Sequence, residues 1–234
     1  PGGRIVADPV SFADLAPTIL ELTGTIRDGM LPISGKSILN ILKSNKQGVV
    51  DPAKKYVFAG RERHSSSRYQ NQGFPMRVIR SKDFLLVWNM KPERWPAGDP
   101  QALDKDGKLL PLFGIDEKGK HHSDWAFTDV DGSPSKSFLI EKHGENNIQH
   151  YFDLAYSKRP EYELFDILND PFCLTNIWDD EKYSQIALEM RSELARELEK
   201  SQDPRVAGAD KEIFESYIRY SPIRYFPEPK EEEK

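Results

Sequence analysis

The spacing of apolar residues predicts a long amphipathic helix near the C-terminal end of this 234-residue chain. Between positions 180 and 201, large apolar side chains recur at helical intervals: Tyr183, Ile186, Met190, Leu194 and Leu198. Residues spaced in this way share one face of an α-helix, and Asp179 or Asp180 can cap its start. A helix with one apolar face needs a second layer to pack against.

Strand-like segments supply that layer. Four segments are rich in aromatic and branched residues and lie between polar turns: YVFAG (56–60), FPMRVIRS (74–81), KDFLLVWNM (82–90) and EYELFD (161–166). The second and third are joined by a short polar turn at 81–83, which predicts a β-hairpin. The chain is therefore predicted to be α+β, with a small antiparallel sheet packed by the long C-terminal helix.

The first 50 residues show a different pattern. Residues 5–10 are apolar and contain a proline, which is typical of an edge strand or of an extended lead-in segment. A helix is predicted over 11–24, with Asp14 as cap, Pro17 in the first turn and Gly24 as the stop.

This helix has an apolar face that we expect to pack on something large: Leu15, Ile19 and Leu22. A second short helix is expected between residues 35 and 45. Residues 1–50 therefore resemble the tail of a preceding domain.

Residues 91–150 are rich in Pro, Gly, Asp and Lys, as in PERWPAGDP, DKDGK and DEKGK. Such a composition predicts a long irregular excursion with few regular elements. Long excursions inside a compact domain are usually functional or disordered. Residues 228–234 predict a disordered, charged tail.

Composition restricts the partners. The chain is 38% hydrophobic and 30% charged, which is typical of folded globular proteins. A net charge of -5 and a pI near 5.7 argue against binding nucleic acid or anionic membranes. No apolar run is long enough to cross a membrane, and the N-terminus has no signal-peptide pattern. Because it lacks an initial Met, we expect the sequence to start inside a longer chain.

The single cysteine, Cys173, lies in the stretch DPFCLTN. A reactive thiol needs a cationic neighbour or a helix N-terminus, but Asp170, Phe172 and Leu174 lie beside this one. We therefore expect Cys173 to be a turn residue without a catalytic role, and no catalytic residue is predicted in the chain.

The histidines provide little support for a metal site. They stand at 64, 121, 122, 143 and 150, and none shows a metal-binding spacing, so no metal site is predicted. His121 and His122 lie in a Gly/Lys/Asp-rich stretch and are expected to be solvated loop residues.

The segment from Arg61 to Arg77 is locally cationic in an acidic chain. Beside Gln70 and Asn71 it carries the predicted ligand-binding residues: Arg61, Arg63, His64, Arg68 and Tyr69. Guanidinium groups bind sulfate, phosphate or carboxylate through paired hydrogen bonds, and histidine adds a titratable donor. The alternative is that these arginines pair with Glu62 and other surface acids.

Three stretches resemble the type I sulfatases. VSFADLAPTILELTG contains a D-hydrophobic-x-P-T stretch of that family, followed after a gap by Gly35-Lys36-Ser37. ELFDILNDPFCLTNIWDD is similar to the family's C-terminal signature, E-L-Y-D-L-x-x-D-P-x-E-x-x-N-L. FPMRVIRSKDFLLVWNM, preceded by a loop with a histidine, most resembles the heparan N-sulfatase (sulfamidase) branch.

The resemblance covers nearly the whole chain but only the C-terminal part of the family's fold. It implies that residues 1–50 trail from an α/β, alkaline-phosphatase-like sulfatase domain and that residues 51–227 form the C-terminal subdomain. The nucleophile, a formylglycine made within C/S-x-P-x-R, and the Ca²⁺ ligands are implied to lie in the missing N-terminal domain. Cys173 has neither the Pro nor the Arg of that motif.

The implied activity is hydrolysis of sulfate esters or sulfamates on sulfated glycans, in the periplasm, outside the cell, or in the lysosome if the source is eukaryotic. The implied partners are the glycan and the N-terminal sulfatase domain of the same chain. His64 is the first residue expected to contact the sugar, since sulfamidase-like relatives carry histidine in this loop. A related phosphate- or phosphonate-ester hydrolase and a free-standing glycan-binding or interaction module remain as alternatives.

Overall fold

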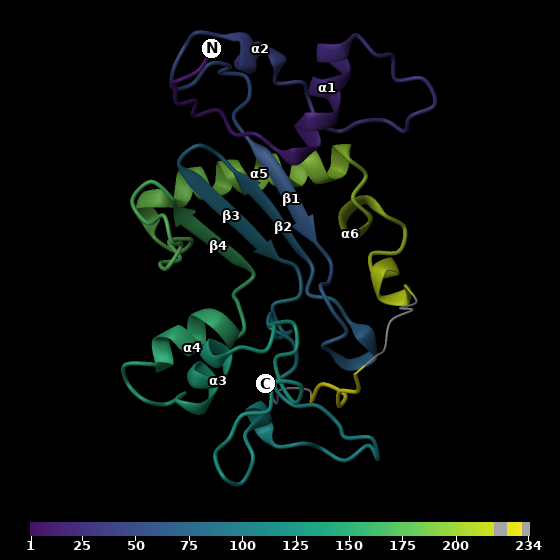
Figure 1. Cartoon of the computed structure of the whole chain (residues 1–234), viewed down its shortest axis with the longest axis vertical. Helices are drawn as coiled ribbons and strands as arrows, with labels where there is room; N and C mark the ends of the chain where they lie inside the picture. The colour runs from purple at the N-terminus through teal and green to yellow at the C-terminus, as the bar shows by residue number, and fades with distance from the viewer. Residues whose placement is uncertain (218–223, 231–234) are drawn as a thin grey trace. The chain divides into compact units, whose positions relative to one another are not determined.

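The computed structural model describes residues 1–217 and 224–230, so residues 231–234 of the predicted tail lie outside the described part. One sheet contains four strands in chain order: β1 (Val57–Arg61), β2 (Met76–Arg80), β3 (Phe84–Asn89) and β4 (Tyr162–Asp166) (Figure 1). The Asn89 N–H donates to the Glu161 carbonyl at 2.7 Å, and the Ile167 N–H donates to the Asp83 carbonyl at 2.9 Å. These bonds fix the antiparallel register of β3 and β4. The predicted sheet and its hairpin are confirmed.

The predicted long helix is α5 (Ser184–Lys200), which a 3-10 turn, η4 (Glu181–Tyr183), precedes. Asp180 caps this turn by accepting the Lys182 N–H at 2.9 Å. The helix buries one face, formed by Ala187, Met190, Leu194 and Leu198. The sheet buries its own apolar residues, among them Ile79, Leu86 and Leu164. These two apolar faces form the helix-on-sheet core expected of an α+β fold.

The N-terminal helices agree with the sequence pattern in position. They are η1 (Phe12–Asp14), α1 (Leu15–Thr23) and α2 (Leu39–Lys43). Gly24 ends α1 with a φ of 67°, a left-handed conformation that glycine adopts without steric cost. The predicted cap was wrong, because the Asp14 side chain makes no capping bond to α1 and Ser11 instead caps η1. Residues 5–10 are extended, with one parallel bridge between Val6 and Gly48.

Asp14 instead joins the two N-terminal sulfatase-like motifs. Its buried carboxylate accepts the Lys36 N–H at 2.9 Å and the Lys54 ammonium at 2.6 Å. Thr18 accepts the Ile38 N–H at 3.0 Å. A Cβ at Gly35 would lie 1.9 Å from the Ala13 carbonyl oxygen, so only glycine fits there. The D-hydrophobic-x-P-T stretch and the G-K-S stretch therefore contact each other in the folded chain.

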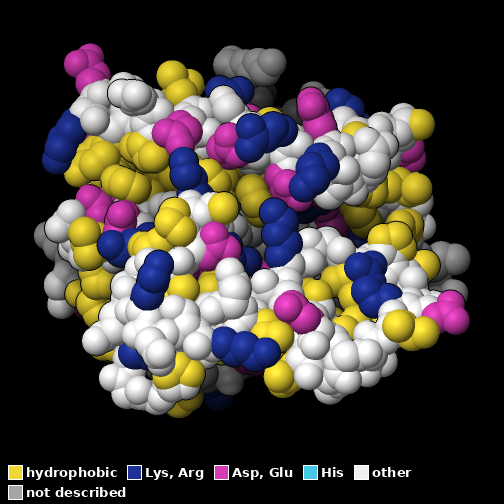
Figure 2. Space-filling view, turned by 90° about the horizontal axis from the view of Figure 1, so that it is seen from above, with side chains coloured by type: hydrophobic (Ala, Val, Ile, Leu, Met, Phe, Trp, Pro, Cys, Tyr) yellow, Lys and Arg dark blue, Asp and Glu magenta, His cyan; other side chains and the backbone are white. Residues whose placement is uncertain are grey.

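The apolar face of α1 is open to solvent within the described part of the chain. Leu15, Ile19 and Leu22 are 48%, 58% and 61% exposed. Other large apolar side chains of this segment are also exposed: Phe12, Ile26, Met30 and Leu31. Figure 2 shows yellow apolar side chains at the surface among Lys and Arg side chains on the face seen from above. The expected packing of this face on something large stays a prediction.

The chain forms two compact units, and the boundary between them runs through the strands. Unit 1 contains 1–59, 78–87 and 164–203, whereas unit 2 contains 60–77, 88–163 and 204–234. Each strand contributes residues to both units. The division predicted at residues 50 and 227 concerns evolutionary domains, and it stays a prediction.

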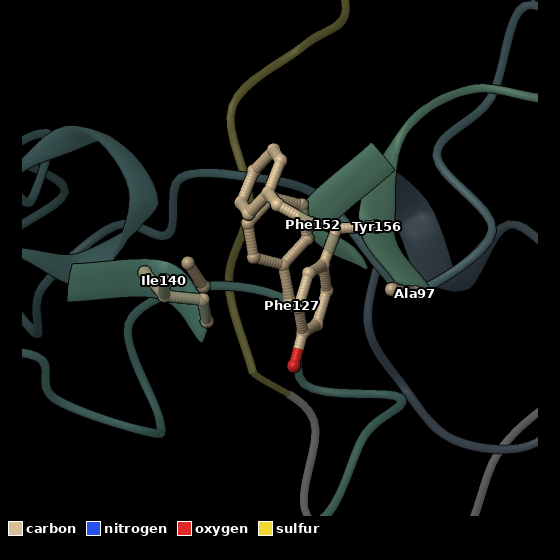
Figure 3. Close-up of a cluster of buried hydrophobic side chains, with 6 residues drawn as sticks. Ala97, Phe127, Ile140, Phe152 and Tyr156 are labelled. Carbon is tan, nitrogen blue, oxygen red and sulfur yellow. The ribbon is translucent and has the colours of Figure 1, made fainter. Parts of the chain in front are cut away.

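The excursion in unit 2 is mostly irregular and contains few regular elements. It contains η3 (Leu112–Gly114), α3 (Pro134–Glu141) and the start of α4 (Gln149–Tyr156). Its core is a cluster of buried residues: Ala97, Ala126, Phe127, Ile140, Phe152 and Tyr156. Figure 3 shows the rings of Phe127, Phe152 and Tyr156 packed together. The prediction of a long irregular excursion with few regular elements is therefore confirmed over most of residues 91–150, although α3 was not identified from the sequence.

Candidate substrate-recognition loop

The cationic loop, residues 61–77, begins in the last residue of β1, passes through η2 (Tyr69–Asn71) and ends in β2. Its anchor is Asp129, whose side chain is 5% exposed. Asp129 Oδ1 accepts the Ser65 N–H at 3.0 Å, the Ser65 hydroxyl at 2.7 Å and the Ser67 hydroxyl at 2.9 Å. Burial opposes ionisation, but Arg68 and the serine hydroxyls hold the pKa of Asp129 below its ordinary value. The anchor is therefore a buried carboxylate.

Arg68 is part of this anchor. Its side chain is 2% exposed, and its Nη2 lies 2.8 Å from Asp129 Oδ2. It also donates to the main-chain carbonyls of Trp95 and Pro96, each at 2.9 Å. To reach a ligand at the surface, this guanidinium would have to break its ion pair with Asp129 and both hydrogen bonds to main-chain carbonyls. The geometry therefore favours a scaffolding role for Arg68, as the alternative reading of the loop allowed.

Arg63 and Glu62 belong to a second polar cluster, the Arg205 network. Arg205 is the second residue of α6 (Pro204–Ala207), and its Nη2 lies 2.7 Å from Glu62 and 2.9 Å from Glu215. Arg63 donates to the Phe214 carbonyl, in η5 (Ile213–Ser216). This network connects the start of the loop to residues 204–217.

Three of the predicted ligand-binding residues keep accessible side chains. Arg61 is exposed, and its side chain forms no hydrogen bond or ion pair with the residues that the structure describes. The His64 side chain is 57% exposed, and its Nδ1 lies 3.2 Å from the main-chain carbonyl oxygen of Asp129. Tyr69 is half-buried. A ligand role for Arg61, His64 and Tyr69 stays a prediction, and these residues lie on a fixed support.

Asp99 gives this support a dependence on pH. Its carboxylate accepts the Tyr69 N–H at 3.2 Å, and burial raises its pKa from 3.8 to about 6. The folded state therefore binds the Asp99 proton more tightly than the unfolded state does. This contribution to stability is present below about pH 4 and is lost as the pH rises through about 6.

We expect Asp99→Asn to remove this dependence, because an amide does not ionise. The free energy of unfolding is measured for both proteins from pH 4 to pH 7. The difference, wild type minus variant, should decrease as the pH rises to about 6 and then stay constant. A difference that stays constant across this range would contradict the assignment.

His121 corrects another expectation. It is not a solvated loop residue: it is 5% exposed, and its Nδ1 lies 2.9 Å from the Ser137 hydroxyl. Burial lowers its pKa. His122 stacks on Trp125 with ring centroids 4.0 Å apart, and its Nε2 lies 2.8 Å from Asp116. Among residues 1–217 and 224–230, no three His, Cys, Asp or Glu side chains gather as a metal site.

Cys173 lies in the turn that follows β4. Its N–H donates to the Asp170 carbonyl at 3.1 Å, and its φ is 54°. Asn176 closes this turn by accepting the Leu164 N–H at 2.9 Å. The geometry agrees with the turn role predicted for Cys173.

The supporting residues of the loop were not identified from the sequence. They come from distant positions: Asp99, Asp129, Arg205 and Glu215. Asp129 stands 61 positions after Arg68, and no spacing pattern connects them. The only local signal was the long excursion itself, which a compact domain rarely tolerates without a role.

The antiparallel sheet, its covering helix and the anchored cationic loop define an α+β region. No family model matches the chain. Over 215 residues it is 23% identical to human N-sulphoglucosamine sulphohydrolase, covering 89% of this chain and 36% of that protein. Over 194 residues it is 25% identical to an ulvan-active sulfatase of Formosa agariphila, covering 82% and 26%. The chain thus resembles the C-terminal part of sulfatases, as its motifs predict.

Solved sulfatase-related structures show a partial likeness of the backbone. One is an enzyme in complex with its substrate D-glucosamine-2-N,6-O-disulfate, with 14% identity and a TM-score of 0.45 over 84% of this chain and 25% of that chain. Another is a 2-O GAG sulfatase, with 17% identity and a TM-score of 0.40 over 82% and 25%. In the described part of the chain, no helix has both the length and the apolarity needed to cross a bilayer.

Proposed function

We propose that this chain is the C-terminal part of a sulfatase that hydrolyses sulfate esters or sulfamates on sulfated glycans, and that its cationic loop recognises the sugar. The observation that carries the proposal is the similarity over 89% of the chain to an N-sulphoglucosamine sulphohydrolase. The chain spans little more than a third of that relative and about a quarter of the ulvan-active one. The remaining length is sufficient for a separate catalytic domain.

The exposed apolar face of α1 supports the proposal that its partner is a catalytic domain of the same polypeptide. A contiguous set of large apolar side chains is rare on a free surface and marks a contact. This face lies within the first 50 residues, where the sequence motifs predict the end of the N-terminal domain. We propose that this domain covers Phe12, Leu15, Ile19 and Leu22, and that the intact protein acts in the periplasm, outside the cell or in a lysosome.

The residues of this chain would bind and orient the glycan. Arg61 offers a planar, permanently charged donor set to a sulfate or carboxylate group. His64 offers its accessible ring to a sugar hydroxyl or an anionic oxygen, and Tyr69 offers a half-buried ring and hydroxyl. A formylglycine and Ca²⁺, both expected in the N-terminal domain, would supply the nucleophile and charge stabilisation. Holding the sugar at the loop places the reacting group by proximity, which lowers the barrier.

We expect His64→Ala in the full-length protein to lower kcat/KM for an N-sulfoglucosamine oligosaccharide about 10- to 100-fold, because a hydrogen bond to a charged group is lost. A small aryl sulfate lacks the sugar that the loop is proposed to contact, so its turnover should change less than about 2-fold. Steady-state kinetics with both substrates measures this difference.

His150→Ala is the matched control, because His150 is an exposed histidine on α4. It should leave both rates unchanged. Equal losses on both substrates in His64→Ala would indicate a folding defect and would remove the support for sugar recognition by this loop.

The alternatives predict different full-length proteins. A phosphate- or phosphonate-ester hydrolase of the same superfamily should turn over an aryl phosphate or phosphonate faster than an aryl sulfate. A free-standing binding module should occur without a hydrolase domain, so the mass of the native gene product distinguishes it. No observation on the described residues favours either over the sulfatase.

A further inference from the structure

The orientation of the His64 ring is set by its only hydrogen-bond partner among the described residues. His64 Nδ1 lies 3.2 Å from the main-chain carbonyl oxygen of Asp129. A carbonyl oxygen accepts hydrogen bonds and never donates them, so Nδ1 must carry the proton. Nε2 then bears the free lone pair in the neutral ring and becomes a second donor when the ring is protonated.

The same residue holds the backbone on which His64 stands. Three groups converge on the Asp129 carboxylate: the Ser65 N–H with its hydroxyl, the Ser67 hydroxyl and the Arg68 guanidinium. These contacts immobilise the four residues that follow the histidine. Asp129 therefore constrains His64 from two directions, through its main-chain carbonyl and through its side chain.

Asp129 is itself fixed by the surrounding backbone. Its N–H donates to the Ala97 carbonyl at 3.0 Å, and the Asp99 N–H donates to the Ser67 carbonyl at 2.7 Å. A Cβ at Gly98, where φ is 95°, would lie 2.8 Å from the Ser67 Cβ. Segment 97–99 is thus packed between the cationic loop and residues 127–129, with no space for adjustment.

Lys136 holds the backbone on both sides of Asp129. The buried Lys136 ammonium donates to the carbonyls of Ser123, Phe127 and Val130 at 3.0, 2.9 and 2.9 Å. A buried ammonium with three carbonyl acceptors holds a loop firmly, since releasing any of them leaves a buried polar group without a partner. The carbonyl that faces His64 is therefore presented by rigid backbone.

We propose that Asp129 is a positioning residue for His64: it selects the imidazole tautomer with hydrogen on Nδ1 and presents Nε2 to the glycan. This inference rests on the proposed function, because it assumes that His64 contacts the sugar. Nε2 accepts from a sugar hydroxyl in the neutral ring and donates to a sulfate or carboxylate oxygen in the charged ring. Asp129 touches no substrate, and its effect passes entirely through the histidine.

The test is a double-mutant cycle in the full-length protein, with kcat/KM for an N-sulfoglucosamine oligosaccharide as the readout. We expect Asp129→Asn to lower this value about 10-fold when His64 is present and less than about 2-fold in the His64→Ala background. A milder pair avoids the buried charge: Ser67→Ala should lower it about 3-fold, whereas Ser66→Ala should be neutral. Ser66 is the matched control, because its buried hydroxyl has no hydrogen-bond partner among residues 1–217 and 224–230.

A second readout does not depend on activity. The ¹⁵N signals of the His64 imidazole, assigned by their loss in His64→Ala, should report the Nδ1-protonated tautomer in the wild type. Asp129→Asn keeps the main-chain carbonyl but loses the carboxylate that anchors the loop, so His64 should lose its fixed position at this carbonyl and show a mixture of tautomers. A wild-type ring protonated on Nε2 would overturn the proposal. So would equal losses of activity from Asp129→Asn in both backgrounds, which would indicate a general structural effect.

The two hypotheses fail differently. If His64→Ala leaves glycan turnover unchanged, the proposed sugar contact is wrong and Asp129 positions no recognition residue, whatever tautomer the ring adopts. If His64→Ala lowers turnover but Asp129→Asn and Ser67→Ala do not, recognition stands and the positioning role is overturned.

Discussion

Replacing Arg205 by methionine is expected to lower the free energy of unfolding of unit 2 by about 3 kcal/mol, because it removes the centre of a buried ionic network. The Arg205 side chain is 2% exposed and bonds to Glu62, Glu212 and Glu215 at 2.7 to 3.0 Å. Burial alone would lower its pKa, but the carboxylates of Glu62 and Glu215 raise it above the ordinary value. Removing the cation leaves these acids close together with less compensation.

The expected loss lies at the lower end for a buried pair, because all three acidic partners keep another cation. Glu62 still has Arg77 at 2.6 Å, Glu212 still has Lys91 at 2.7 Å, and Glu215 still has Arg94 at 2.7 Å. Hydrogen exchange of peptides covering residues 57–80 and 204–217 measures the local loss. Arg196→Met is the control, since Arg196 is 72% exposed and, among the described residues, pairs only with Glu193 on the surface of α5. A surface pair of this kind contributes less than about 1 kcal/mol. Equal effects of the two changes would contradict the network's role.

Phe127→Ala should cost about 3 to 5 kcal/mol, because the ring lies at the centre of the unit 2 core. Phe127 has no exposed surface and contacts four other aromatic rings: Trp95, Phe113, Phe152 and Tyr156. Its φ of 51° is unfavourable for any residue with a Cβ, so alanine keeps this strain while losing the packing. Hydrogen exchange over residues 123–156 and near-ultraviolet circular dichroism report the loss.

Phe138→Ala is the matched comparison within the same region. Phe138 lies on α3 but is 51% exposed, so its truncation should cost less than about 1 kcal/mol. If both variants were destabilised equally, the aromatic cluster would not be the core of this unit. If Phe127→Ala retained wild-type exchange, the cluster would contribute little to its stability.

Local patterns predicted the elements whose apolar residues repeat regularly. The hairpin over 74–90, the strand at 161–166 and the helix at 184–200 each have a periodic apolar face, so the sequence carries their signal directly. The helices α3 and α4 were missed because glycine, lysine and acidic residues surround them. A signal was nevertheless present: Ser133 accepts the Lys136 N–H at 3.1 Å, and Pro134 occupies the first turn.

The candidate site was predictable only in part, for a physical reason. Sequence proximity showed that cations cluster between 61 and 77, but it could not show which of them are neutralised by residues far along the chain. Arg68 is buried because Asp129 accompanies it, and Arg63 is engaged because residues 214–215 return to it. Arg61 remains accessible because no such partner reaches it from the residues that the structure describes. His64 is 57% exposed although its Nδ1 lies 3.2 Å from the Asp129 carbonyl oxygen.

The path of the chain limits how this protein can be divided. The polypeptide passes from one compact unit to the other after residues 59, 77, 87, 163 and 203. A protease nick or a gene fusion at any one of these points would still leave the two units joined by the other crossings of the chain. Neither unit could be inherited, lost or exchanged alone, so shuffling of this region between proteins is expected to move it whole.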